Sequence, residues 1–86
     1  MATIFVVIRK GLDGVSLLPH YHTTVGPARE AMLMHATNEV LTQRDRDGDR
    51  FYADVHARSI DIVREADGQD AETVAMFEIR QMEQAP

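Results

Sequence analysis

The sequence predicts an α+β domain in which one α-helix packs on an antiparallel sheet of four to five strands, in the order ββαβ(β)β. Three observations predict it: residues 3–9 are β-branched and aromatic, residues 28–43 contain no proline or glycine, and residues 51–57 and 73–82 alternate in polarity. We expect one domain over residues 1–86, with residues 83–86 as a frayed tail.

The first strand, residues 3–9, is expected to lie in the middle of the sheet. Its apolar side chains fall on both faces, with Ile4, Val6 and Ile8 on one and Phe5 and Val7 on the other. Strands that are apolar on both faces are typical of central positions. Two glycines in the turn at residues 10–14 then predict a hairpin with a second strand at residues 15–18, and residues 19–25 are expected to be extended or loop.

A single helix is expected at residues 27–43, because Pro27 is tolerated in a first helical turn. Most of the larger apolar side chains share one side of this helix, with Met34 at its edge: Met32, Leu33, Ala36, Val40 and Leu41. The opposite side is mainly polar: Ala28, His35, Asn38, Glu39 and Thr42. We therefore expect four residues to pack on the sheet: Leu33, Ala36, Val40 and Leu41.

Charged and turn-forming residues separate the remaining elements. Residues 44–50 predict a charged turn, and the alternation that follows predicts a strand at residues 51–57. A further strand at residues 60–63 follows a break, and a turn at residues 66–70 precedes the last strand, at residues 73–82. A helix over residues 71–82 is the rival interpretation of that last segment, because alanine, glutamate and methionine favour helices.

The net charge of −5 lies entirely in the second half of the chain. Residues 1–43 carry three basic and three acidic side chains, whereas residues 44–86 carry six arginines and eleven carboxylates. This balance argues against nucleic-acid binding and leaves room for a basic protein partner, with Asp67, Asp70 and Glu72 as candidate contacts. The alternatives are a solvated face that aids solubility and a mimic of nucleic-acid phosphate.

The composition also limits which disulfides, metal sites and cellular locations are expected. The chain has no cysteine, which excludes disulfides and thiolate metal sites. Its apolar runs are too short for a signal peptide or a membrane span, so we expect no membrane association and a cytoplasmic location.

Histidines and aspartates form two pairs with a spacing of two residues, His20 with His22 and Asp54 with His56. Within a strand such residues point to the same face, and together the four could supply nitrogen and oxygen ligands to a transition metal. The alternative is that these are ordinary solvent-facing polar residues, and in that case no cofactor is expected.

The other motifs that could form a functional site are absent or do not match their pattern. Residues 45–49 resemble part of a calcium-binding loop, but Gln43 and Asp54 stand where the pattern needs an acid and a glutamate, and arginines would oppose the cation. No nucleophile elbow and no glycine-rich phosphate loop is present. The sequence therefore favours a protein that is not an enzyme.

The first strand is apolar on both faces, but a single helix covers only one face of a sheet. We therefore expect the other apolar face to be a surface for self-association. We expect a homodimer, with Phe5, Val7 and Met34 as candidate contacts. The functional hypothesis is a small non-enzymatic protein-binding module, such as a regulator or inhibitor of a larger complex. Small α+β domains of this layout include phage-encoded inhibitors, an analogy at the level of fold alone. The alternative hypothesis is a metal- or small-molecule-binding protein, with or without catalytic activity, that uses the histidine and aspartate pairs.

Overall fold

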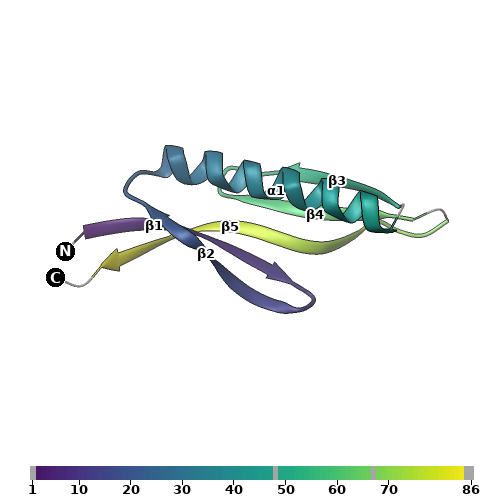
Figure 1. The fold of residues 1–86 in the computed structure, drawn as a ribbon, viewed down its shortest axis with the longest axis horizontal. Coiled ribbons are helices and arrows are strands. Elements are labelled where there is room, and N and C mark those ends of the chain that lie inside the picture. Colours follow the sequence, from purple (N-terminus) through teal and green to yellow (C-terminus); the bar gives the residue numbers. More distant parts are fainter. Residues whose placement is uncertain (1, 48, 67, 85–86) are drawn as a thin grey trace.

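A computed structural model describes residues 2–47, 49–66 and 68–84, and its fold class is the predicted one. The helix α1 (Val25–Asp47) packs on a sheet of five antiparallel strands. These strands are β1 (Ala2–Gly11), β2 (Gly14–His22), β3 (Arg50–Val55), β4 (Ser59–Glu65) and β5 (Glu72–Gln84). The molecule is elongated, 52 × 22 × 19 Å, with the helix along its long axis (Figure 1).

The strands lie in the order β2-β1-β5-β4-β3, so the first and last strands of the chain are neighbours inside the sheet. The first strand is thus an interior strand, as predicted, although β5 and not β1 occupies the middle of the sheet. Both edges of the sheet belong to the strands that flank the helix, since α1 carries the chain from β2 at one edge to β3 at the other. Figure 1 shows both termini at the same end of the molecule.

Several predicted boundaries were too short. The segment after residue 18, predicted as extended or loop, continues β2 to His22, although the pairing of β2 with β1 is irregular between Val6 and Ile8. The predicted charged turn was wrong over residues 44–47, which extend α1 to Asp47, and residue 48 lies outside the described residues. Extra turns cost little here because each one adds backbone hydrogen bonds without a second nucleation step.

The last segment is a strand, as preferred, and the rival helix over residues 71–82 is wrong. Strand β5 reaches Gln84, so the predicted tail began two residues too early, and residues 85–86 lie outside the described residues. Pairing with β1 on one side and β4 on the other satisfies the backbone of β5, and this tertiary gain outweighs the local helix propensity.

The buried side of α1 differs from the predicted one. Ala28, Met32 and Ala36 are buried against the sheet, together with Val7, Ile60, Ile62, Ala75, Phe77 and Ile79. Val40, as expected, packs at the margin of this core. The predictions for Leu33 and Leu41 were wrong, since about half of each side chain is exposed. The placement of Ala28 on the polar side was also wrong. Small side chains at positions 28 and 36 let the helix axis approach the sheet closely, so the closest contact follows the alanines rather than the leucines.

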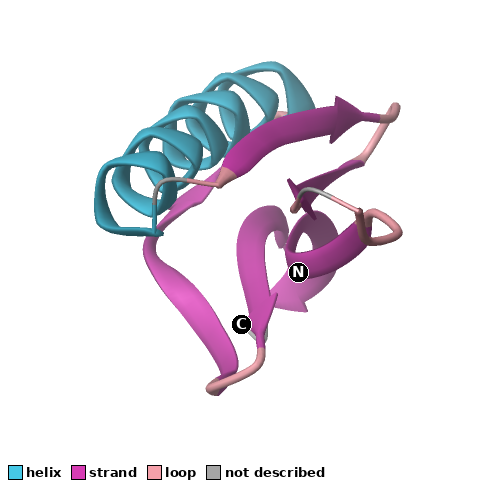
Figure 2. Ribbon diagram, turned by 90° about the vertical axis from the view of Figure 1, so that its right-hand side faces the viewer, coloured by secondary structure: helices cyan, strands magenta, loops and turns pink. Residues whose placement is uncertain are grey.

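The helix covers only one face of the sheet. Figure 2 shows α1 on one side, with β2 running to a hairpin tip on the far side of the molecule from the helix. The last segment of the chain does not cover the second face, because β5 lies within the sheet itself. On that second face Val6 and Ile8 of β1 are buried, although they are not part of the core beneath α1, whereas Val15, Leu17 and Tyr21 of β2 are exposed.

Candidate functional site

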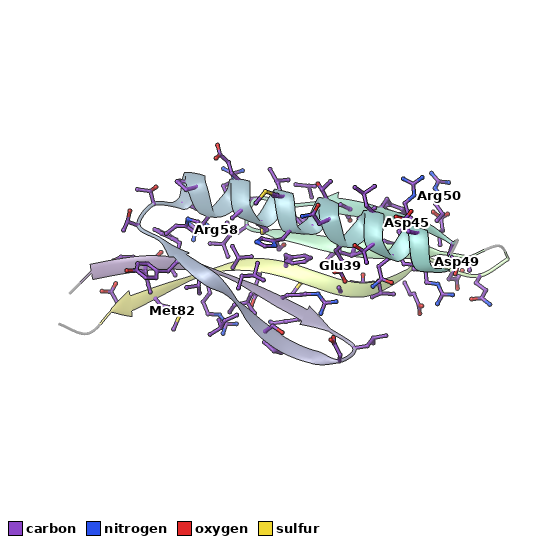
Figure 3. The ribbon with its side chains drawn as sticks, viewed as in Figure 1. Glu39, Asp45, Asp49, Arg50, Arg58 and Met82 are labelled. Carbon is purple, nitrogen blue, oxygen red and sulfur yellow. The ribbon has the colours of Figure 1, made fainter. Side chains whose placement is uncertain are left out.

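The second face of the sheet carries an exposed apolar surface along its β2 edge. Cross-strand partners on neighbouring strands point to the same face, and the register pairs Val6 with Tyr21 and Ile8 with Leu17. The exposed members of this group, called here the β2 surface, are Val15, Leu17, Tyr21 and Met82, with the partly buried Ile4 beside them. Val6 and Ile8 belong to the same face but are buried. Val15, Leu17 and Tyr21 are each more than half exposed. Figure 3 shows Met82 on the side of the sheet away from the helix.

The predicted contact residues divide between the two faces. Val7 is buried beneath α1 and Phe5 packs at the margin of the same core, so the prediction that these two lie on a free surface was wrong. The other face of the strand, with Ile4, Val6 and Ile8, is turned away from the helix, but Val6 and Ile8 are buried there as well. Sequence alone could not choose between the two faces, because both are apolar. Met34 on α1 is more than half exposed.

The two edges of the sheet differ in charge. Strand β2 has the sequence GVSLLPHYH, which contains no acidic residue, lysine or arginine. Strand β3 at the other edge contains both Arg50 and Asp54. Natural sheets guard their edges with charged side chains because a bare edge pairs with other chains. Only the β3 edge carries such charged side chains. The β2 edge has none, and its pairing with β1 is irregular near Pro19.

A small cavity of about 170 Å³ lies between α1 and β2. Three candidate residues from the sequence analysis line this cavity: His22, Val7 and Met34. The other lining residues are His35 and Ala31 of the helix and Leu18 of β2. The sequence assigned His35 to a polar face, whereas it is half-buried here. No charged lysine, arginine or carboxylate lines this cavity, so its lining is apolar apart from the two imidazoles.

The predicted four-residue metal site is not assembled as one group. His22 is on β2 and Asp54 on β3, at opposite edges of the sheet. For His20 only the backbone is described, within β2, and its side chain lies outside the described residues. Asp54 and His56 do come together, and the structure adds Asp61 from β4, the cross-strand partner of Asp54.

Asp54, His56 and Asp61 form a compact group at the β3–β4 hairpin. His56 Nε2 lies 3.5 Å from Asp54 Oδ2 and 3.5 Å from Asp61 Oδ2. Its backbone N–H donates to the carbonyl oxygen of Ser59 at 2.8 Å, which closes the turn between the strands. The sequence signal for Asp61 was available in principle, since a tight turn at residues 56–59 places residues 54 and 61 opposite each other.

The opposite end of the molecule is rich in ion pairs. Arg64 donates from Nε and Nη2 to Asp49 Oδ2, at 2.8 and 2.5 Å, and its Nη1 lies 3.7 Å from Glu72 Oε1. A charged cleft of about 360 Å³ adjoins it, lined in part by Arg9, Arg64 and Glu72. In Figure 3, Asp45, Asp49 and Arg50 gather at this end, away from Arg58 and Met82.

The acidic residues proposed as contacts for a basic partner lie near this end. Asp70 is exposed in the turn before β5, and Glu72 is exposed at the start of that strand. Asp67 lies outside the described residues. Arg64 partly neutralises Glu72, so of the three predicted residues the structure presents Asp70 as an exposed carboxylate on a turn.

The helix of the described chain is long but polar, and none of its stretches is apolar enough to cross a bilayer. Comparison with protein-family models, with curated proteins and with solved structures finds no match for this chain.

Proposed function

We propose that the protein is a small non-enzymatic protein-binding module that binds along its β2 edge, and that its occupant there is a second copy of this chain. One observation carries the proposal: an edge strand without lysine, arginine or carboxylate exposes three apolar or aromatic side chains, Val15, Leu17 and Tyr21. Exposed apolar groups beside an unpaired strand edge favour pairing with another strand.

Charge supports a second copy as the occupant. The acidic excess belongs to residues 44–86, whereas β2 itself carries no formal charge. Two copies that meet at β2 therefore avoid bringing their acidic halves together. A twofold arrangement also places the same apolar strip on both sides of the interface, which is the self-complementary contact that closed dimers use. The same proposal includes a cytoplasmic location and a role as a regulator or inhibitor of a larger complex.

The test is the oligomeric state of the purified chain at micromolar concentration, measured by light scattering coupled to size-exclusion chromatography. We expect a mass of twice the 9.7 kDa of one chain. Leu17→Lys should weaken the dimer by about tenfold or more, because even 1.4 kcal/mol of lost interface energy is a tenfold change in affinity. The leucine is 64% exposed, so the monomer should keep its fold.

The matched control is Val55→Lys on β3, a side chain of similar exposure, 56%, at the other edge of the sheet. It should leave the dimer unchanged. A mass of 9.7 kDa for the unmodified chain would refute self-association, as would equal weakening by both lysine variants. Circular dichroism on each variant distinguishes a lost interface from a lost fold.

A further inference from the structure

We infer that Asp54, His56 and Asp61 form a binding site for a divalent transition metal ion of the zinc type. The site lies on the β3–β4 hairpin, at the sheet edge opposite β2, so it is independent of the proposed self-association. It differs from the metal site expected from sequence, because the ligands come from one hairpin and do not include His20 or His22.

The separations of the ligand atoms fit such an ion. Two ligands about 2.0–2.1 Å from a tetrahedral zinc ion lie about 3.3 Å from each other. Nε2 of His56 lies 3.5 Å from one oxygen of each aspartate, and all three ligand atoms lie within 4.8 Å of one another. An ion between them needs only small side-chain rotations, and its remaining coordination positions face solvent.

The backbone holds the three ligands in place. Asp54 and Asp61 are direct partners in the β3–β4 register, so their side chains leave the same face of the hairpin. Two hydrogen bonds fix the turn that carries His56: its own N–H donates to Ser59, and the N–H of Ile79 on β5 donates to the carbonyl oxygen of Arg58 at 2.9 Å. The ligand set is therefore anchored to the sheet.

The charge around these ligands is the second, independent argument. Like charges directly opposite on neighbouring strands destabilise a sheet. Several other acidic residues of the described sheet and its flanks have an arginine or lysine partner, as Glu78 has in Lys10 and Asp49 has in Arg64. For Asp54 and Asp61, no arginine or lysine nitrogen of the described chain is recorded within 4.0 Å, and their neighbour at that distance is the imidazole of His56. A divalent cation would balance the two carboxylates while a neutral imidazole coordinates it.

The donor set also selects the class of metal. Imidazole nitrogen with carboxylate oxygen suits zinc and its neighbours, whereas magnesium and calcium prefer oxygen ligands alone. We therefore expect one equivalent of Zn²⁺ to bind in isothermal titration calorimetry of protein without a histidine tag, and Co²⁺ to give visible absorption bands at the same stoichiometry. Mg²⁺ should not compete with either ion at equal concentration.

Variants of the ligands give the decisive comparison. His56→Ala and Asp61→Asn should each lower the Zn²⁺ affinity by at least about tenfold, the smallest loss usual even for groups that only orient metal ligands. The matched controls His22→Ala and His35→Ala each remove an imidazole from the cavity between α1 and β2, and should leave the affinity unchanged.

All three ligands are at least partly exposed, so the variants should keep the fold, which circular dichroism checks. The inference is overturned if Zn²⁺ fails to bind at one equivalent. It is also overturned if folded His56→Ala retains the affinity of the unmodified chain, or if the control variants lose as much affinity as the ligand variants.

Discussion

Arg9 on β1 and Glu39 on α1 form an ion pair across the interface between sheet and helix, with 2.6 Å between Arg9 Nη2 and Glu39 Oε1. Both side chains are about four-fifths shielded from solvent. Gln43 donates to the same glutamate oxygen at 3.3 Å. The hydrogen bond to Glu39 is also the main reason that the pKa of Arg9 lies above its ordinary value. This pair therefore connects the helix to strand β1 at the margin of a core that is otherwise apolar.

A double-mutant cycle with Arg9→Ala and Glu39→Ala should give a coupling of about 1 kcal/mol in the free energy of unfolding, since hydrogen bonds between charged groups contribute about 1.5–3 kcal/mol before solvent screening. The same arginine supplies the control, because its Nη1 lies 3.1 Å from Asp13 Oδ1, and Asp13 is 81% exposed. The cycle of Arg9→Ala with Asp13→Ala should show no measurable coupling. Equal coupling in the two cycles would contradict the shielding argument.

The buried side of the helix predicts opposite outcomes for two adjacent residues. Met32 is 2% exposed and Leu33 is 46% exposed. Met32→Ala should cost about 2–5 kcal/mol of unfolding free energy, because it leaves a cavity between α1 and the sheet. Leu33→Ala should cost less than about 1 kcal/mol, since little of its burial is lost. Urea unfolding of both variants decides the point, and a larger loss for the leucine would show that the helix packs through the opposite side.

The ion pair between Lys10 and Glu78 predicts a dependence of stability on pH. The pKa of Glu78 lies below its ordinary value of 4.5, mainly because Lys10 donates a hydrogen bond to its carboxylate. A lowered pKa in the folded state stabilises the protein above the unfolded pKa, and this contribution is lost as pH falls through the folded value. Glu78→Gln should therefore lower the urea midpoint at pH 6 and have a progressively smaller effect below about pH 4.

The control for that pH dependence is Glu30→Gln, an exposed glutamate on α1 that has no ion pair within the described ranges. Its urea midpoint should follow that of the unmodified chain at every pH. An effect of Glu78→Gln that stays constant from pH 6 to pH 3 would mean that the glutamate acts through packing rather than through its charge.

Local sequence patterns were enough to predict the order of elements. The β-branched run at residues 3–9, the stretch free of proline and glycine after Pro27 and the alternation before Met82 each favour one type of backbone through contacts within the segment. The apolar residues on both faces of the first strand were also sufficient to place it inside the sheet. Such preferences are decided over a few neighbouring residues, so no knowledge of the fold is needed to read them.

The buried face of α1 and the grouping of the site residues required the tertiary structure. Periodicity gives an apolar arc, but the crossing of helix and sheet decides which part of it makes close contact, and here small side chains at 28 and 36 decided it. The strand order put His22 and Asp54 at opposite edges, while the hairpin register set Asp61 beside Asp54. The strand order depends on pairing between segments distant in sequence, above all β1 with β5, and local composition does not encode which such pairing has the lowest free energy. The register of Asp54 with Asp61 depends instead on where the chain turns within one hairpin, which alternating polarity alone does not fix.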